Sequence, residues 1–374
     1  MTRQTYNKYK KGICGRPKRK PKTDRGSIHL TRELFHFDDA GRLFIGSKKN
    51  NIGVLSFKKH RSHGVPNSIY IRKEAGGYSV SFCFDDGQDE TPISDKEHLS
   101  YLQGADRAWL DEHVVGVDRG VAIPVHGGSE KLTFDFSDGQ KKNKARHERY
   151  VKRYQRRLAR QNKGSKRRNT TKLKIAKRHK KVANIREDFC HQTSHQLVNS
   201  PAKVIVFEDL KTASMTRKPK AKQDDLGRFL PNKARAKAGL NKSILNVGWH
   251  RLESFTRYKA ERAGKAVFKV SAAYTSQECA NCDHTHPSNR KSQAEFHCGC
   301  CGNIDNADRN ASLVIKKRAI NLLLDSGTEL RGKGIPVLCT GRGAKRQSQR
   351  EKSLCAVGNE ASKKKRNVAT KVAA

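Results

Sequence analysis

The sequence predicts an α/β fold in which buried strands and flanking helices follow a small antiparallel β domain. Three observations predict it. Apolar runs end in acidic residues at 118 and 208, a long basic segment carries apolar residues at helical spacing, and four cysteines form two Cys-x2-Cys pairs. The 374 residues are enough for one large domain or two to three ordinary ones.

The charge balance identifies the class of partner. The chain holds 79 Lys and Arg against 36 Asp and Glu, a formal net charge of +43. A chain this basic repels itself unless a polyanion compensates, which favours nucleic acid as the partner. No segment approaches the roughly 18 apolar residues of a membrane span, and the first residues lack the apolar core of a signal peptide. We therefore expect a cytoplasmic or nucleoid-associated protein.

The first third of the chain predicts a flexible start and a β domain. Residues 1–26 are basic, rich in Gly and Pro, and without apolar period. Short strand patterns follow up to residue 86, and the one at 77–84 alternates apolar and small polar side chains. Residues 87–112 are polar and suggest a connector, so the β domain with its connector is expected over 27–112.

The core is expected over 113–275 and contains two insertions. Apolar runs ending at 117 and 207, and a third from 266, predict its buried strands, and a helix is predicted over 242–262 and stopped by Gly264. The first insertion is a basic helical hairpin at 141–198, and the second a polar, Lys-rich flap at 211–240. A cysteine segment at 276–303 and a helix at 304–325 follow, and residues 326–374 lack an apolar pattern, which predicts a disordered basic tail.

The basic hairpin is the predicted nucleic-acid-binding element. Residues 141–186 hold 21 Lys or Arg against the single acidic Glu148. Tyr150, Tyr154 and Leu158 recur every four residues, as the apolar seam of a helix does. Charge at this density suits contacts with a phosphate backbone, without reading the base sequence. The candidate contact residues are Arg153, Arg156, Arg157, Arg160, Lys177 and Arg178.

The clustered cysteines predict a metal site. Each Cys-x2-Cys pair can place two thiolates on one tight knuckle, and two knuckles form a closed tetrahedral site that suits structural zinc. One alternative is that the thiols cluster by chance and bind no metal. Another is an iron–sulfur cluster, which is less favoured than zinc because nothing nearby indicates redox chemistry. The proposed zinc ligands are Cys279, Cys282, Cys298 and Cys301.

Three carboxylates predict a second, catalytic metal site. Asp118 and Glu208 each end an apolar strand, and Asp308 begins a helix. A lone acid at a strand end is more often a cap or a surface ion-pair partner. Hydrolysis of a phosphodiester by two Mg²⁺ ions, however, needs carboxylates that converge from separate elements. In so basic a chain this order of acids favours the metal site, whereas Asp305 is expected to cap the helix.

Several motifs together resemble the TnpB/OrfB family encoded by bacterial insertion sequences, relatives of the type V CRISPR effector nucleases. The resemblance covers about residues 15–325. The sequences that carry it are GVDRG at 116–120, VFEDL at 206–210, YTSQECANC at 274–282, CGCCG at 298–302 and DNADRNAS at 305–312.

The resemblance implies an RNase H-like core of the RuvC type, split by the basic hairpin and the zinc ribbon. It implies that Asp118, Glu208 and Asp308 are the first, second and third catalytic acids. It further implies an endonuclease that binds a guide RNA and cuts matching target DNA, with the hairpin beside the heteroduplex. Members of the family have also been described as transposases.

Two departures from the family pattern stand out. The stretch before GRPK at 15–18 is shorter than usual, so we expect both recognition of a flanking DNA motif and opening of the DNA duplex to be affected. Arg119 follows the first acid where an apolar residue is more usual, and strand alternation predicts that it points away from the metals.

Three other functions remain as alternatives. The chain could be a truncated or domesticated nucleic-acid-binding protein or repressor without cleavage, which has no chemical need for the three acids. It could be a structural RNA-binding protein, which also leaves them unused. A DDE-type strand transferase shares the fold and the metals, but the position of Asp308 directly after a zinc ribbon speaks against it.

Overall fold

The computed structural model describes residues 10–13, 26–47, 49–58, 62–85, 87, 92–332 and 334–340. Most of the predicted flexible start and the end of the predicted tail lie outside these residues. The chain forms two compact units, one from residues 1–91 and 147–181, the other from 92–146 and 182–374. None of the helices in the described part of the chain is long and apolar enough to cross a membrane.

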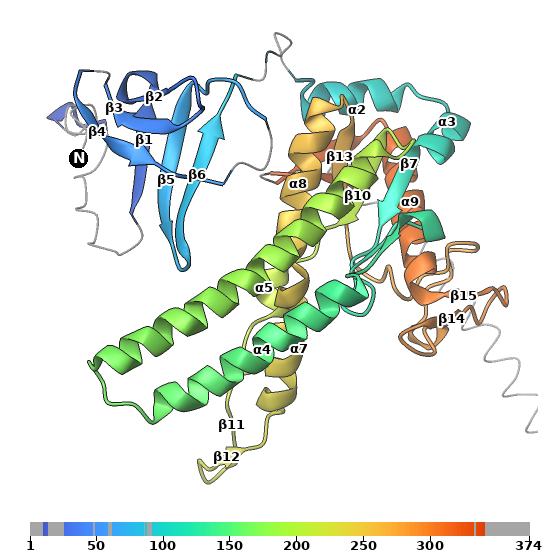
Figure 1. Cartoon of the computed structure of the whole chain (residues 1–374). Coiled ribbons are helices and arrows are strands. Elements are labelled where there is room, and N and C mark those ends of the chain that lie inside the picture. The colour runs from blue at the N-terminus through green and yellow to red at the C-terminus, as the bar shows by residue number, and fades with distance from the viewer. Residues whose placement is uncertain are drawn as a thin grey trace, which may run out of the picture. The chain divides into compact units, whose positions relative to one another are not determined.

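The first unit contains two antiparallel three-stranded sheets and the outer part of a helical hairpin (Figure 1). The sheets have the orders β1-β5-β6 and β2-β3-β4 and share a core around Phe35, Leu43 and Ile69. The six strands lie within the region up to residue 86 where short strand patterns were expected, and β6 matches the alternating pattern at 77–84. The strands are β1 (Ser27–Thr31), β2 (Phe35–Phe37), β3 (Leu43–Gly46), β4 (Asn51–Leu55), β5 (Ser68–Glu74) and β6 (Gly77–Cys83).

The second unit is built on a five-stranded sheet with the order β16-β17-β13-β10-β7. The strands β7, β10 and β13 are parallel, so their carboxyl ends share one edge. A short antiparallel pair, β8 with β9, continues from β7 through a bridge between Asp118 and His126. The strands are β7 (Val114–Val117), β8 (Val125–His126), β9 (Thr133–Phe134), β10 (Val204–Glu208), β13 (Ala266–Val270), β16 (Thr328–Arg331) and β17 (Val337–Thr340).

Helices cover both faces of this sheet, because its buried strands are apolar on both sides. On one face, Val204 and Val206 pack with helices α2 (Asp95–Gln103), α3 (Arg107–His113) and α9 (Ala307–Leu324). On the other face, Ile205 and Phe207 pack with α8 (Trp249–Arg262) and the C-terminal part of α5. The result is a three-layer α/β/α arrangement, in which β10 lies between α8 and α9 (Figure 1).

The basic hairpin consists of α4 (Asp138–Ala159) and α5 (Lys166–Asn199), joined by a turn at 160–165 (Figure 1). Gly164 adopts φ +86° in this turn. Asn169–Thr171 lie within α5, where the Thr170 and Thr171 hydroxyls donate to backbone carbonyls one turn earlier.

The predicted helix at 242–262 is two helices, α7 (Ala234–Val247) and α8, separated by Gly248 in the left-handed conformation. The predicted flap at 211–240 therefore ends in α7, and it also contains α6 (Thr212–Met215) and the short strands β11 (Lys222–Gln223) and β12 (Phe229–Leu230).

Two further boundaries need correction. The polar connector predicted at 87–112 contains α2 and α3, and α2 begins with a capping box of Ser94 and Glu97. The predicted tail at 326–374 begins with β16 and β17, which extend the main sheet and bury Leu338 against it. Both segments are short and amphipathic, so packing against the core, not local apolar content, determines their structure.

Candidate functional site

Asp118 lies just beyond β7, on the sheet face covered by α9. Gly116 faces α9 so closely that a Cβ there would lie 2.2 Å from the Ser312 carbonyl oxygen. Asp118, two residues further, shares this face by strand alternation. Its backbone N–H and carbonyl are both bonded to those of His126, at 2.9 and 3.0 Å. These bonds hold the main chain that carries the Asp118 carboxylate.

Glu208 ends β10 on the same face, and it is buried. Alternate residues of a strand point to the same face, so the Glu208 side chain lies on the face of Val204 and Val206, which pack against α9. The Thr275 hydroxyl, from the turn after β13, donates to the Glu208 carboxylate. Thr275 is itself buried, so it fixes one oxygen of this carboxylate.

Asp308 lies in the first turn of α9. The side chain of Asn306 caps this helix by accepting the backbone N–H groups of Asp308 and Arg309, at 2.9 and 3.1 Å. The prediction that Asp305 is the cap is therefore wrong. Asp305 instead forms an ion pair with Arg309 at 3.0 Å.

The three acids lie close enough to perturb one another. Burial first, and then the negative charges of Glu208 and Asp308, raise the pKa of Asp118 to about 8. Burial also raises the pKa of Glu208 and of Asp308. A site of this kind favours either protonated carboxyls or a bound cation.

The carboxylates are more widely spaced than the cysteine thiols. Within the described residues, only the four cysteines form a group of three or more possible ligands whose donor atoms all lie within 4.8 Å of one another. Carboxylates that held two divalent ions would not need so tight a group, because they would be divided between the ions.

Arg290 brings a positive charge to the same site from the cysteine segment. Its guanidinium lies 3.8 Å from Asp308, and its charge lowers the pKa of all three acids against the effect of burial. The sequence analysis missed Arg290, Thr275 and His126. None of them ends an apolar run as an acid, belongs to a Cys-x2-Cys pair or lies in the basic hairpin.

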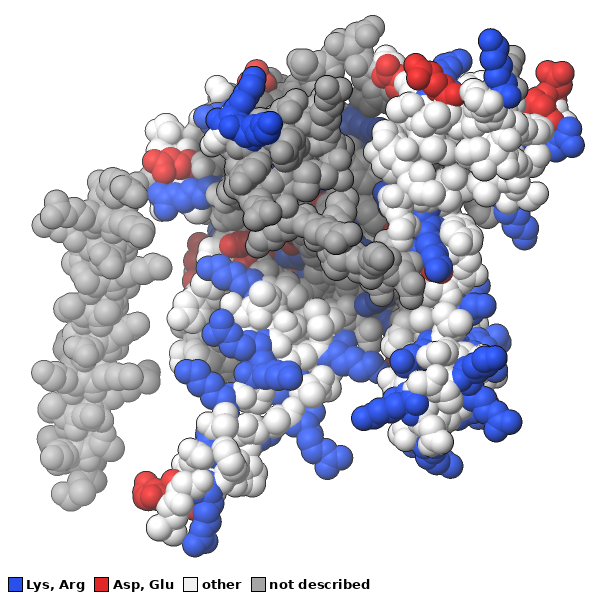
Figure 2. Space-filling view, turned by 90° about the vertical axis from the view of Figure 1, so that its left-hand side faces the viewer, with Lys and Arg blue, Asp and Glu red and all other residues white. Residues whose placement is uncertain are grey.

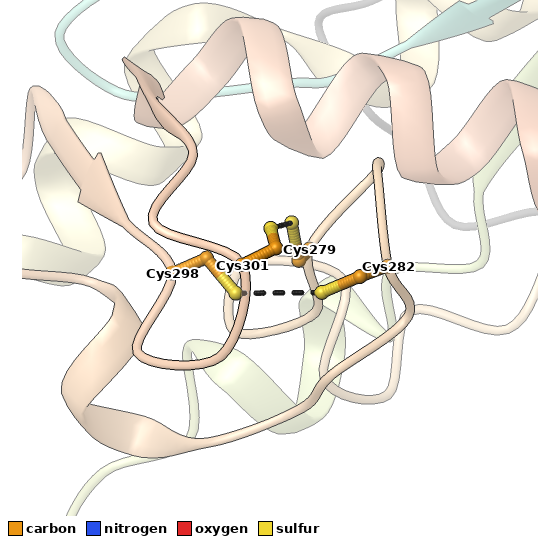
Figure 3. Close-up of side chains that lie close together, drawn as sticks. All are labelled: Cys279, Cys282, Cys298 and Cys301. Atoms are coloured by element: carbon orange, nitrogen blue, oxygen red, sulfur yellow. Dashed lines mark hydrogen bonds between the residues drawn. The ribbon is translucent and has the colours of Figure 1, made fainter.

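The four predicted cysteine ligands come together, with their thiols turned toward one another (Figure 3). The sulfur atoms of Cys279 and Cys301 are 3.7 Å apart, and those of Cys282 and Cys298 are 3.5 Å apart. A hydrogen bond from the Asn303 backbone contributes most to lowering the pKa of Cys301, to about 7. Four sulfur donors at this spacing can hold one metal ion.

Two buried asparagines hold the cysteine segment together and attach it to α9. Asn289 accepts from Gly299 N–H at 3.0 Å and donates to the Gln277 and His284 carbonyls. Asn310, one turn after the start of α9, accepts from Ala280 N–H at 3.0 Å and donates to the Glu278 carbonyl at 2.8 Å. The strands β14 (Glu295–His297) and β15 (Ile304–Asn306) complete the segment.

The candidate nucleic-acid-binding residues are mostly exposed on the hairpin. Arg153, Arg156, Arg157, Arg160 and Lys177 are exposed. Arg156 and Arg157 lie three and four residues after Arg153 and so share its face of α4, and Arg160 directly follows the helix. Arg178 differs, because its guanidinium lies 4.4 Å from the Tyr150 ring centroid. The face of the protein drawn in Figure 2 shows many Lys and Arg and few acidic side chains.

Comparison with known proteins supports the family resemblance. Residues 101–218 match the OrfB_IS605 family, described as "Probable transposase", and residues 249–315 match the Cas12f1-like TNB domain. The chain is 33% identical over 262 residues to "Putative RNA-guided DNA endonuclease InsQ" of Escherichia coli, a match that covers 70% of this chain and 59% of InsQ.

A second relative is "CRISPR-associated endodeoxyribonuclease Cas12f1" of Sulfoacidibacillus thermotolerans, 34% identical over 35% of this chain and 27% of the relative. A third, a "Putative RNA-guided DNA endonuclease" of Streptomyces pristinaespiralis, is 23% identical over 78% of this chain and 62% of the relative. The chain thus spans about three fifths of InsQ. Asp118 and Glu208 lie in the segment that matches the OrfB_IS605 family, and the four cysteines and Asp308 lie in the segment that matches the Cas12f1-like TNB domain.

Proposed function

We propose that this protein is an RNA-guided DNA endonuclease of the bacterial cytoplasm, and that Asp118, Glu208 and Asp308 hold the divalent ions, Mg²⁺, that its reaction requires. The observation that carries the proposal is the convergence of three carboxylates, from β7, β10 and α9, on one side of one sheet edge. The strand order also supports an RNase H-like core of the RuvC type, because β9, β8 and β7 continue into β10 and β13.

The residues fit such ions by chemistry. Oxygen ligands suit Mg²⁺, and a bound cation would offset both the burial and the repulsion from Glu208 and Asp308 that raise the pKa of Asp118. When bound, the ions activate the attacking water and stabilise the leaving oxygen of a phosphodiester. Thr275 orients the Glu208 carboxylate, and the His126 backbone orients Asp118.

The four cysteines have a separate role in the proposal. Cys279, Cys282, Cys298 and Cys301 would hold a structural Zn²⁺, since four thiolates close the coordination shell and leave no position for substrate. The zinc would stabilise a segment that has only a small apolar core, around Phe296.

Nucleic acids are the proposed partners. A guide RNA and its target DNA together present the polyanion that a net charge of +43 requires. The exposed arginines of α4 and Lys177 of α5 would contact the phosphates of the heteroduplex.

The test is a cleavage assay on the full chain, purified after expression with its neighbouring DNA so that its own RNA is bound. DNA matching that RNA should be cut in Mg²⁺ and left intact without it. Asp118→Asn, Glu208→Gln and Asp308→Asn should each lower the cleavage rate by at least about 10³-fold while RNA still co-purifies. Asp209→Asn is the matched control, since this acid follows Glu208 on the opposite face, and it should cut normally.

The outcomes separate the alternatives. Cleavage at full rate by one of the three variants would remove that residue from the site. A wild-type protein that binds RNA and matching DNA without cutting would instead be the RNA-guided binder without nuclease activity.

A further inference from the structure

A second charged cluster lies on the sheet face opposite the three carboxylates. Arg119, Glu253 and Lys269 come from the end of β7, from α8 and from β13. Their side chains are only 1%, 11% and 14% exposed. Arg119 follows Asp118 directly, so strand alternation sends the two side chains to opposite faces of one strand end.

Each charge in this cluster is paired. One terminal nitrogen of Arg119 donates to Glu253, and the other oxygen of Glu253 accepts from Lys269 at 2.7 Å. The guanidinium also lies over the Phe207 ring, 5.2 Å from its centroid. Burial of unpaired charges is costly, so this pairing is what allows the cluster to exist in the core.

The remaining terminal nitrogen of Arg119 reaches the active-site strand. It donates to the main-chain carbonyl of Glu208. The ladder between β7 and β10 ends one residue earlier, at Val117 and Phe207. The Arg119 side chain therefore continues the connection between the two strand ends at the level of Asp118 and Glu208.

We propose that Arg119, held by Glu253 and Lys269, is a positioning residue that sets the spacing of Asp118 and Glu208 for their divalent ions. This inference rests on the proposed function of these two acids. The planar guanidinium donates in two fixed directions at once, toward Glu253 and toward the Glu208 carbonyl, and an ammonium group lacks that fixed geometry. Its charge and its geometry can therefore be separated by substitution.

The test measures Mn²⁺ binding to the zinc-loaded full chain by electron paramagnetic resonance, together with the melting temperature. Arg119→Met and Arg119→Lys should each raise the Kd for Mn²⁺ by roughly 10- to 100-fold, because positioning contacts behind metal ligands have effects of this size. Cleavage by Arg119→Lys should recover partly at high Mn²⁺ or Mg²⁺, as expected when the site is misaligned but its ligands remain.

Lys265→Met is the matched control. Lys265 immediately precedes β13, at the opposite edge of the sheet, and donates to the Val198 and Ser200 carbonyls. Its loss should lower the melting temperature without changing the Kd for Mn²⁺. Unchanged Mn²⁺ affinity in Arg119→Lys would overturn the proposal. This variant decides the test by itself if Arg119→Met does not fold.

Asp118→Asn distinguishes this proposal from the proposed function. If the wild-type chain and Asp118→Asn bind Mn²⁺ equally, the acids are not the ligands and the proposed function fails. If Asp118→Asn loses Mn²⁺ and Arg119→Lys does not, the acids bind metal and only the positioning role fails.

Discussion

At the scale of single residues, the site is a group of acids that the fold holds against their own repulsion. Asp118 shows this most clearly, since burial and two neighbouring carboxylates raise its pKa to about 8. The fold therefore binds the Asp118 proton more tightly than the unfolded chain does. A cation in the site replaces that proton and reverses the effect on stability.

This predicts a pH dependence of the metal-free site. The stability that protonated Asp118 contributes is fully present below the ordinary pKa of 3.8 and is lost as the pH rises through the folded-state pKa of about 8. In zinc-loaded protein without Mg²⁺, the free energy of unfolding should fall by about 1–2 kcal/mol between mildly acidic and mildly basic pH. Urea unfolding should show a flatter profile for Asp118→Asn, and a fall of equal size in both proteins would contradict the assignment.

The Thr275 hydroxyl allows a second test at this scale. Thr275→Val keeps the shape of the side chain but removes the hydrogen bond to Glu208. Cleavage should slow by roughly 10-fold, since partners of metal-binding carboxylates have effects of this size. The neighbouring Ser276→Ala is the control, and equal rates for both variants would show that Thr275 does not orient Glu208.

The acids could be predicted from sequence because each follows an apolar run or opens an amphipathic helix. Thr275 and Arg290 could not, because a single Thr or Arg in a polar stretch carries no pattern. Their roles depend on where β13 and the cysteine segment return the chain, which is a property of the tertiary fold.

At the scale of elements, the approach of α9 to β7 determines where Asp308 lies. A Cβ at Gly116 would be 2.2 Å from the Ser312 carbonyl oxygen and 2.5 Å from Lys316 N. Gly116→Ala should therefore push α9 away and destabilise the protein by about 1–3 kcal/mol, with loss of cleavage. Gly139→Ala, at an exposed position of α4, should change neither unfolding nor cleavage.

The attachment of the cysteine segment to α9 gives a further prediction. Asn310→Ala leaves the Ala280 N–H and the Glu278 carbonyl without their side-chain partner, which should cost about 1–3 kcal/mol. Limited proteolysis should then cut within 276–303 earlier than in wild type, although zinc is still bound. Cys279→Ser should show the same early proteolysis and should also lose the zinc. Asn321→Ala, at an exposed position of α9, is the control and should show neither early proteolysis nor zinc loss.

The sequence patterns located most strands of both units and the extent of α9. They failed for α2 and α3, whose residues are largely polar and which gain their structure by packing on the sheet, and for β16 and β17, which are only four residues long and form by pairing with that sheet. The Ser94 and Glu97 capping box was the available signal for α2. The division of α7 from α8 depends on Gly248, and a glycine inside a helical pattern does not reveal whether the helix ends there.

At the scale of the whole molecule, charge is the dominant property. Neutralising Arg153, Arg156, Arg157 and Arg160 together should weaken RNA and heteroduplex binding. The slope of log affinity against log salt should fall by about 0.7–0.9 for each phosphate that α4 no longer neutralises. An unchanged slope would show that α4 does not touch phosphate. Arg178→Gln should instead lower stability, because Arg178 packs on Tyr150.

The turn at 160–165 has a practical consequence. Asn162, Lys163 and Gly164 are exposed there, at the tip of the hairpin. Exposed tips of this kind tolerate new termini and inserted domains. The chain should therefore accept circular permutation or a fused cargo between Lys163 and Gly164, with the sheet edge that carries Asp118 and Glu208 left intact.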